Sequence, residues 1–228
     1  MEAVILAGGM GTRLAKAVPD VPKPMAPIDG KPFLWYLLKW LIRFPVSKLI
    51  LSTGYKTDTI MNFFGDSFMG IPVEYAIEGE PLGTGGGLML AVGKVSEPDF
   101  LVINGDTYFP VDLREFYSFH TIHSAFITVA LKRMKDFSRY GAVECSDGKI
   151  LQFHEKKLCH DGFINGGIYA INRMWLISQH FPEIFSLEKE ILEKRAGTGD
   201  LRCLIFNAPF LDIGIPEEYN RASDVLSK

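Results

Sequence analysis

The sequence predicts a mixed α/β fold in which a mainly parallel sheet is flanked by helices. Two observations lead to this prediction. In the first half, short apolar runs alternate with helix-like segments, an order typical of parallel strands joined by right-handed crossovers. In the second half, several strand-like runs follow one another without helices between them, which favours hairpins and a mixed sheet.

The elements of the first half are indicated by apolar periodicity and by their flanking residues. One run is short, wholly apolar and followed directly by glycines, so it predicts a buried strand. Leucines at helical spacing follow Pro32, which suits the first turn of a helix. The predicted strands are Ala3–Ala7, Lys48–Thr53, Pro72–Ile77 and Phe100–Ile103, and the predicted helices are Lys31–Phe44, Thr57–Phe64 and a stretch that follows the glycines at 83–87 and ends near Val92.

The second half is expected to form a lid over the first. The predicted strands are Ala125–Lys132, Ala142–Cys145, Ile150–His154, Phe163–Asn172 and Leu201–Phe206, and the predicted helices are Arg114–Ile122, Met174–His180, Leu187–Arg195 and Glu217–Leu226. No repeat, low-complexity run or linker interrupts the pattern, so we expect residues 1–228 to form a single domain.

Composition excludes several classes of protein. The 228 residues are 47% apolar, enough to bury a core without disulfides or structural metals. A net charge of −3 offers no broad basic surface for nucleic acid or an anionic membrane, so we expect neither as a partner. Three cysteines form no disulfide framework, and no segment has the length of a signal sequence or a membrane span, so we expect a cytoplasmic protein.

A glycine-rich segment, GGMGTR at residues 8–13, follows the first predicted strand. Glycine tolerates positive φ and allows several N–H groups to face one phosphate. Arg13 adds a planar guanidinium suited to polyphosphate. The spacing fits neither the dinucleotide fingerprint nor the P-loop, and a tight strand-to-helix turn is the alternative interpretation.

A lysine between two prolines comes next along the chain. Pro22 and Pro24 stiffen the backbone around Lys23, so the sequence predicts a non-helical segment that holds this charge near the glycines. An exposed lysine in a proline-rich turn is the alternative.

Two aspartates follow apolar stretches in distant parts of the chain. Asp106 comes after Phe100–Ile103, where the carboxyl end of a strand places ligand-binding residues in an open α/β sheet. Asp212 stands in a similar position, although an aspartate that caps a turn is the alternative there. Mg²⁺ binds one or two carboxylates together with substrate phosphates, so the pair predicts a magnesium site.

The glycine segment with its following leucine (GGMGTRL, 8–14) and PKPM (22–25) resemble the signature of the sugar-1-phosphate nucleotidyltransferase family. Within it, the chain is similar to short guanylyltransferases acting on mannose or D-glycero-D-manno-heptose 1-phosphate. The resemblance covers nearly the whole chain and implies a Rossmann-like, GT-A-like nucleotidyltransferase fold without a left-handed β-helix domain. Residues up to about 110 would bind the nucleotide, and residues from about 111 to 228 the sugar phosphate.

The resemblance also assigns roles to residues. It implies catalytic roles for Arg13, Lys23 and Asp106, and Mg²⁺ ligation by Asp106 and Asp212. The implied nucleotide-binding residues are Leu6, Ala7, Gly8, Gly9, Gly11, Thr12, Glu80 and Gly85, and the implied sugar-phosphate-binding residues are Glu155, Lys156, Asn165 and Gly167. The implied product is a nucleotide sugar, such as GDP-heptose, for surface polysaccharide synthesis.

Glu80 favours GTP as the nucleotide. A carboxylate accepts two parallel hydrogen bonds, and guanine offers N1–H and its 2-amino group side by side. Uracil and thymine offer one donor between two carbonyls, and cytosine and adenine offer a single amino contact. Glu80 bonded to loop N–H groups is the alternative.

Other residues are assigned to packing or solvent. His120, His123, Cys159 and His160 do not supply four convergent zinc ligands, and the basic run 132–135 is a solvated cluster or the rim of a substrate site. Trp35 and Trp40 indicate core packing, with a contact in a homo-oligomer as the alternative.

Three rival functions stay open on sequence alone. A glycosyltransferase normally carries an acidic-x-acidic metal motif, whereas residues 104–106 are NGD. A uridylyl- or cytidylyltransferase acting on another sugar 1-phosphate or a phospho-alcohol differs only in specificity. A non-catalytic regulatory paralogue tends to lose the chemical residues, and this chain retains Arg13, Lys23, Asp106 and Asp212.

Overall fold

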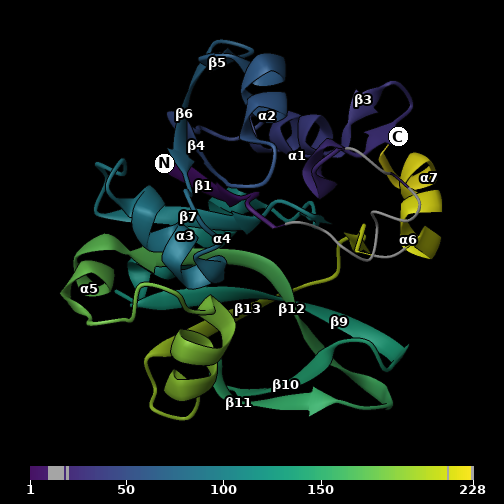
Figure 1. Cartoon of the computed structure of the whole chain (residues 1–228). Helices are drawn as coiled ribbons and strands as arrows, with labels where there is room; N and C mark the ends of the chain where they lie inside the picture. The colour runs from purple at the N-terminus through teal and green to yellow at the C-terminus, as the bar shows by residue number, and fades with distance from the viewer. Residues whose placement is uncertain (10–17, 19–20, 215, 227–228) are drawn as a thin grey trace.

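A ten-stranded mixed sheet runs through both halves of the chain in the computed structural model (Figure 1). The structure describes residues 1–9, 18, 21–214 and 216–226. The strand order is β10-β11-β13-β9-β12-β7-β1-β4-β6-β5. The predicted mixed α/β fold is therefore confirmed. None of the helices in these residues is long and apolar enough to cross a membrane.

The first half forms the parallel part of the sheet. β1 lies between β4 and β7, and β4 pairs with β6, all in parallel register. The strands of this part are β1 (Glu2–Leu6), β4 (Lys48–Thr53), β6 (Ile71–Ile77) and β7 (Asp99–Asn104), with the short β5 (Ser67–Phe68) antiparallel at the edge.

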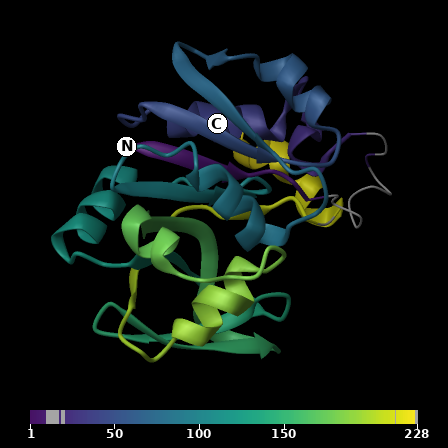
Figure 2. The ribbon, with the colours of Figure 1, turned by 60° about the vertical axis from the view of Figure 1, so that its left-hand side comes forward.

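The second half continues the same sheet, so the expected lid is wrong. β12 pairs antiparallel with β7 and β9, and only β13 and β9 are parallel in this half. Its strands are β9 (Ile127–Phe137), β10 (Gly141–Ser146), β11 (Lys149–Lys156), β12 (Cys159–Asn172) and β13 (Leu201–Phe206). A mainly parallel sheet therefore describes the first half alone, since the other pairings of the second half are antiparallel, among them the β10–β11 hairpin. Figure 2 shows these strands in the lower part of the view, where they continue the twist of the sheet.

Helices cover both faces of the sheet. One face packs against α1 (Phe33–Leu41), α2 (Thr57–Phe64) and α4 (Leu113–Ile122). The other face packs against α3 (Gly83–Val92), α5 (Arg173–Ser178) and the π-helix η3 (Leu187–Glu193). The middle of strand β1 is apolar because both of its faces are covered: Ala3 and Ile5 join the first layer, Val4 joins the second, and all three are fully buried.

Most predicted elements are present, and the differences lie at their ends. The helix predicted over 31–44 begins at Phe33 because residues 31–32 pair as β3 with β2 (Pro27–Ile28). The helix predicted over 217–226 is broken into α6 (Pro216–Asn220) and α7 (Ala222–Leu226). Two short strands that the sequence did not indicate, β8 (Thr107–Tyr108) and β14 (Leu211–Asp212), pair with each other.

Candidate active site

Two adjoining cavities open at the carboxyl ends of the central parallel strands. The Ala7 N–H donates to the Ser52 carbonyl (2.8 Å), and the Gly105 N–H donates to the Leu6 carbonyl (2.9 Å). These bonds hold the ends of β1, β4 and β7 together. Because both cavities are lined by Leu6, Gly9 and Thr84, they form one continuous site with two compartments.

The first compartment, of about 410 Å³, is rich in glycine and lies between the ends of β1, β4 and β6 and the start of α3. It is lined by Gly8, Gly9, Gly54, Gly79, Gly83 and Gly87, together with Leu6, Ser52, Tyr55, Glu78, Glu80, Pro81 and Thr84. The predicted nucleotide-binding residues Leu6, Gly8, Gly9 and Glu80 are thus brought to one cavity.

Glu78 is a carboxylate of this compartment that sequence reasoning missed. Its Oε2 accepts a hydrogen bond from the Leu82 N–H (3.0 Å), and its Oε1 accepts one from the Ser52 hydroxyl (3.4 Å). The first of these bonds closes the loop that carries Glu80, which is exposed at the cavity wall. The signal that pointed to it was present: Glu78 follows the third strand directly, as Asp106 follows the fourth.

The Glu78 carboxylate lies close against Gly8. A Cβ on Gly8 would lie 2.4 Å from Glu78 Oε1, and one on Gly87 would lie 2.7 Å from the same atom. Positive φ, the property expected of the loop glycines, is found at neither Gly8 nor Gly9. Among the described glycines of this loop, the lack of a side chain at position 8 therefore serves packing.

The second compartment, of about 390 Å³, contains both cationic and anionic side chains. It is lined by Leu6, Ala7, Gly9, Lys23, Pro24, Thr84, Asn104, Asp106, Glu188 and Gly214. Glu188 is a second carboxylate that the sequence did not indicate. Its Oε2 accepts from the Thr84 hydroxyl (2.7 Å) and from the Ser186 hydroxyl (2.8 Å), which fix it at the wall.

Lys23 lies between the two predicted metal ligands. Its Nζ is 2.5 Å from Asp106 Oδ2 and 3.5 Å from Asp212 Oδ1. The two aspartates are far apart in sequence, and the pairing of β8 with β14 joins them, with Asp212 opposite Thr107. Lys23 starts a short 3-10 helix, η2 (Lys23–Met25), so the expectation of a non-helical segment is wrong at that residue.

The donor set suits a divalent cation. Two carboxylates converge on one ammonium group, and Asp106 and Lys23 line the second compartment. In the part of the chain that the structure describes, no group of three or more metal-binding side chains occurs. Asp106 and Asp212 together with phosphate oxygens therefore constitute the set that fits Mg²⁺.

Asp212 is held in place by local hydrogen bonds. Its Oδ1 accepts from the Gly214 N–H (2.7 Å), and its Oδ2 accepts from the Tyr140 hydroxyl (3.4 Å). Burial raises the pKa of Tyr140, and the neighbouring Asp212 charge adds to this, bringing the pKa to about 12. Tyr140 thus stays a neutral donor at physiological pH.

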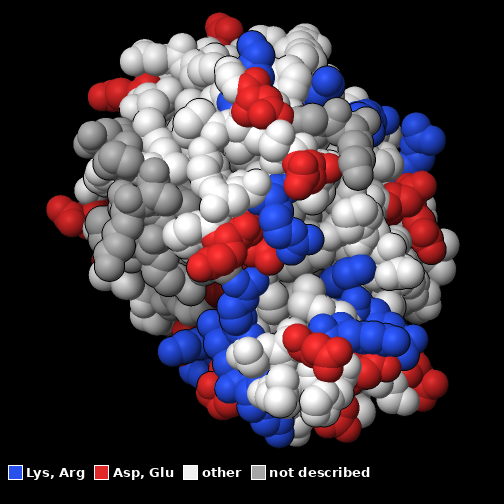
Figure 3. Space-filling view, turned by 90° about the vertical axis from the view of Figure 1, so that its right-hand side faces the viewer, with Lys and Arg blue, Asp and Glu red and all other residues white. Residues whose placement is uncertain are grey.

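The predicted sugar-phosphate residues occupy two strands of the second half. Glu155 and Lys156 are exposed at the end of β11. Asn165 uses both ends of its amide within β12, donating to the Tyr169 hydroxyl and accepting from the Gly167 N–H, each at 2.9 Å. Figure 3 shows Lys and Arg side chains gathered over the lower part of this face, where β9 to β11 lie.

Four other predicted site residues line neither compartment or lie outside the described part of the chain. The Gly85 N–H donates to the Phe185 carbonyl (2.9 Å), and a Cβ on Gly85 would lie 2.2 Å from the Phe185 ring. Its lack of a side chain therefore admits the aromatic ring of the 181–185 segment. Gly11, Thr12 and Arg13 lie outside the described residues.

The histidines that the sequence assigned to packing lie outside both compartments. His120 Nδ1 is 2.8 Å from the Thr128 hydroxyl in the core, and burial lowers its pKa although Asp99 opposes the shift. His123 contacts the Phe119 carbonyl at the end of α4.

Comparison with known proteins gives a full-length match. The family model described as Nucleotidyl transferase matches residues 2–228. The chain is 45% identical to a D-glycero-α-D-manno-heptose 1-phosphate guanylyltransferase of Aneurinibacillus thermoaerophilus, over 99% of this chain and 98% of that protein. It is 40% identical to the enzyme of the same name from Campylobacter jejuni subsp. jejuni serotype O:2, over 96% and 97%.

A solved structure has the same fold. HddC from Yersinia pseudotuberculosis, complexed with GMP-PN, superposes with a TM-score of 0.87 at 36% identity, covering 98% of both chains.

Proposed function

The chain belongs to the nucleotidyl transferase family, and we propose that it transfers GMP from GTP to D-glycero-α-D-manno-heptose 1-phosphate, releasing pyrophosphate. One observation carries the proposal: Lys23 bridges Asp106 and Asp212 in a compartment that adjoins a glycine-lined cavity. Charged groups for a triphosphate and space for a nucleoside thus lie side by side at the carboxyl ends of the strands.

The proposed reaction is an in-line attack by a sugar-phosphate oxygen on the α-phosphorus of GTP. The attacking oxygen is already ionised near neutral pH, so no general base is required. The chain's task is to position two anions and offset their charge. Lys23, whose side chain is 11% exposed, would contact the α-phosphate, and Arg13 would stabilise the departing pyrophosphate.

Mg²⁺ fits this scheme through Asp106 and Asp212. When bound, Mg²⁺ supplies charge neutralisation on the triphosphate. The Lys23 ammonium now lies against both carboxylates, so Lys23 would exchange these partners for phosphate oxygens as the substrate enters. Tyr140 and the Gly214 N–H would keep Asp212 oriented during this exchange.

Two carboxylates support guanine as the base. Glu80 lines the first compartment and would accept from guanine N1–H and the 2-amino group. Glu78 bonds the Leu82 N–H and so fixes the loop that carries Glu80. Specificity would depend on both, with Glu80 contacting the base and Glu78 setting its position.

The sugar phosphate would bind in the second half of the chain. Lys156 would neutralise the phosphate, and Glu155 and Asn165 would bind sugar hydroxyls near Gly167. The choice of sugar follows the two heptose 1-phosphate guanylyltransferases to which this chain is similar. We place the enzyme in the cytoplasm because all three cysteines are free thiols.

The decisive experiment measures pyrophosphate release. ATP, CTP, GTP and UTP are each combined with glucose, mannose and heptose 1-phosphates, with Mg²⁺ or with EDTA. We expect GTP with heptose 1-phosphate and Mg²⁺ to be fastest. No pyrophosphate release with any pair of substrates would contradict the proposed enzymatic activity. Faster release with UTP than with GTP would contradict the role of Glu80. Faster release with mannose 1-phosphate than with heptose 1-phosphate would change the assigned sugar.

A further inference from the structure

The strand that joins the two halves of the sheet has a bulge where it passes from one half to the other. β12 (Cys159–Asn172) lies between β9 and β7 (Figure 1). Its pairing with β9 runs in regular register to Asn165 and Leu131, but the next pair is Tyr169 with Val129. Two extra residues of β12 are therefore accommodated between these pairs. Bulges re-aim the side chains beside them and are frequent next to active sites.

Two glycines allow this bulge. Gly167 has a φ of +71°, in the left-handed region that favours glycine. A Cβ on Gly166 would lie 2.5 Å from the Phe109 ring, and one on Gly167 would lie 3.0 Å from Asn104 Nδ2. The bulge thus brings β12 into close contact with the end of β7, where Asn104 lines the second compartment.

The side chains on the two sides of the bulge meet at one oxygen atom. Asn165 Nδ2 donates to the Tyr169 hydroxyl at 2.9 Å, and the Asn104 side chain also forms a hydrogen bond with this hydroxyl. Tyr169 is 0% exposed, so its hydroxyl cannot touch a substrate. It joins Asn165, which we propose above to bind the sugar, to Asn104 at the wall of the second compartment.

The surroundings keep this hydroxyl neutral. Burial raises the pKa of Tyr169, and the negative charge of Glu188 adds to the rise. The phenol oxygen therefore accepts the Asn165 hydrogen bond at physiological pH, and a ring without the hydroxyl would leave Asn165 Nδ2 without this partner.

We propose that Tyr169 is a positioning residue whose hydroxyl fixes the Asn165 amide in the orientation that binds the sugar. Asn104, at the end of β7, sets the place of the hydroxyl, and the bulge lets Asn165 reach it. The effect on sugar binding rests on the function proposed above, in which Asn165 contacts the sugar.

The kinetic test compares Tyr169→Phe with Tyr117→Phe, using GTP, heptose 1-phosphate and Mg²⁺. Tyr117 is the matched control because its hydroxyl donates to the Asp99 carbonyl (2.6 Å) at the other end of β7. In Tyr169→Phe we expect the KM for the sugar phosphate to rise about 3- to 10-fold, with kcat and the GTP KM within about threefold of the wild type. Tyr117→Phe should leave all three constants unchanged. An unchanged sugar KM in Tyr169→Phe, or an equal rise in both variants, would overturn the proposal.

A double-mutant cycle shows whether Tyr169 acts through Asn165. If it does, Tyr169→Phe/Asn165→Ala should have the same sugar KM as Asn165→Ala, because the amide that the hydroxyl orients is already absent. Effects of the two substitutions that add would contradict the positioning role.

Nuclear magnetic resonance tests the contact without turnover. The Asn165 side-chain amide protons should exchange slowly with solvent in the wild type and at least about 10-fold faster in Tyr169→Phe, but not in Tyr117→Phe. Fast exchange in the wild type would overturn the proposal even if Tyr169→Phe does not fold. An inactive wild type with the expected Asn165 signals would contradict only the proposed function, and the positioning of Asn165 by Tyr169 would stand.

Discussion

The two ends of the central strand β1 carry the same charge arrangement for different purposes. At its carboxyl end, Lys23 contacts Asp106 and Asp212 at 2.5 and 3.5 Å. At its start, Lys48 contacts Glu2 and Glu74 at 3.0 and 3.5 Å. A lysine between two carboxylates is therefore not by itself a sign of function.

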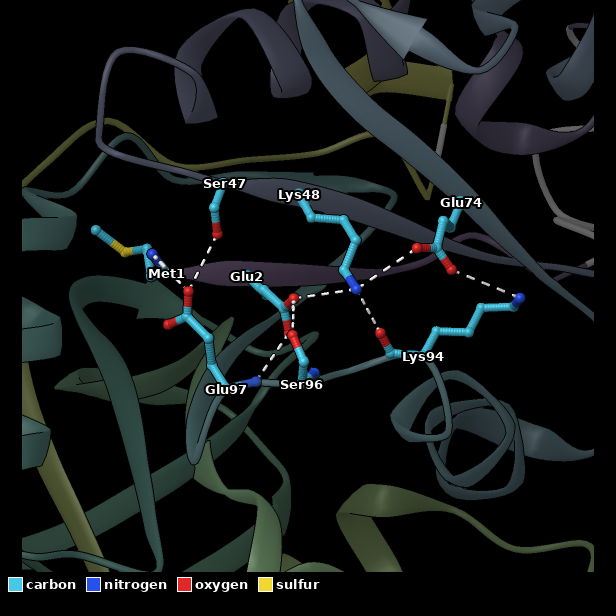
Figure 4. A network of polar contacts seen from close by, with 8 residues as sticks. All are labelled: Met1, Glu2, Ser47, Lys48, Glu74, Lys94, Ser96 and Glu97. Atoms are coloured by element: carbon cyan, nitrogen blue, oxygen red, sulfur yellow. Dashed lines mark hydrogen bonds and ion pairs between the residues drawn. The ribbon is translucent and has the colours of Figure 1, made fainter.

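The polar neighbours at the start of β1 satisfy Glu2 completely. Figure 4 shows Glu2 accepting from the Ser96 N–H and hydroxyl, each at 2.7 Å, and from the Glu97 N–H at 3.1 Å. Lys48 also donates to the Lys94 carbonyl at 2.6 Å. Burial alone would raise the pKa of Glu2, but the bonds from Ser96, Lys48 and Glu97 outweigh it and lower the pKa to about 2.

The two ends differ in how many hydrogen bonds their carboxylates can still accept. Glu2 is 4% exposed and accepts from four donors. Asp106 has a side chain 38% exposed, faces a cavity and accepts only from Lys23 and the Thr107 hydroxyl (3.3 Å) among the described residues. A carboxylate with oxygen lone pairs directed into open space can take a cation and phosphates, whereas a saturated one stabilises the fold.

Among the variants considered, Asp106→Asn should show the largest effect, and this effect should be a loss of activity. It removes a metal-binding charge, so pyrophosphate release should fall by roughly 10²-fold or more. The melting temperature should change little, because Asp212 remains as an ion-pair partner of Lys23 at 3.5 Å and the amide oxygen introduced at position 106 can still accept a hydrogen bond. Activity within threefold of the wild type would contradict the metal assignment.

Glu2→Gln should affect stability alone. A pKa lowered from 4.5 to about 2 corresponds to roughly 3 kcal/mol of stabilisation, at about 1.4 kcal/mol per unit. That contribution is complete above pH 4.5 and is lost as the pH falls towards 2. We therefore expect a loss of about 2–3 kcal/mol in urea unfolding at pH 7, shrinking below pH 4.5.

The controls for Glu2→Gln lie in the same network. Glu74→Gln, with a side chain 42% exposed, should cost under about 1 kcal/mol. Turnover of folded Glu2→Gln at 25 °C should match the wild type, and a 10-fold fall would show that the two ends are coupled.

Gly8→Ala should affect both stability and nucleotide binding. The new Cβ would displace the Glu78 carboxylate and release Leu82, so we expect about 1 kcal/mol of destabilisation and a GTP KM raised about 10-fold. Gly9→Ala is the control for unfolding without nucleotide, because no atom of the described residues lies within 4 Å of its Cβ position. Gly8→Ala/Glu78→Ala should recover the stability but not the KM.

Tyr140→Phe should show the smallest effect. Its hydroxyl donates one bond to Asp212 Oδ2, and one such bond is worth about 0.5–1.5 kcal/mol. We expect the Mg²⁺ concentration for half-maximal activity to rise about 2- to 10-fold with kcat nearly unchanged. An unchanged Mg²⁺ dependence would show that Asp212 needs no such support.

Much of the parallel half could be predicted from the sequence because its signals are local. A strand buried on both faces carries a run of apolar residues at its centre, as Leu49, Ile50 and Leu51 do in β4, and β4 has the same bounds as its prediction. Asp106 was found for the same reason, since it directly follows such a strand. The direction of the strands in the second half was harder, because pairing between distant strands leaves no trace in a short window.

The parts of the site that were missed depend on long-range contacts. The position of Glu78 after the third strand indicates that it lies near the site, but only the approach of Gly8 and Gly87 shows that its carboxylate is enclosed. Gly85 looks like a loop glycine, yet the Phe185 ring, a hundred residues away, occupies the space beside it.

The sequence by itself determined the glycine loop, the proline-flanked lysine, the two aspartates and the apolar strands that carry them, because each is written in a few adjacent residues. Only the tertiary structure decided that Lys23 contacts both Asp106 and Asp212, since the β8–β14 pairing joins segments about a hundred residues apart. The tertiary structure also distinguished Lys23, beside an open cavity at the carboxyl end of β1, from Lys48, in a saturated network at its start. The physical reason is that bonding capacity depends on which donors and which open space surround a side chain after folding.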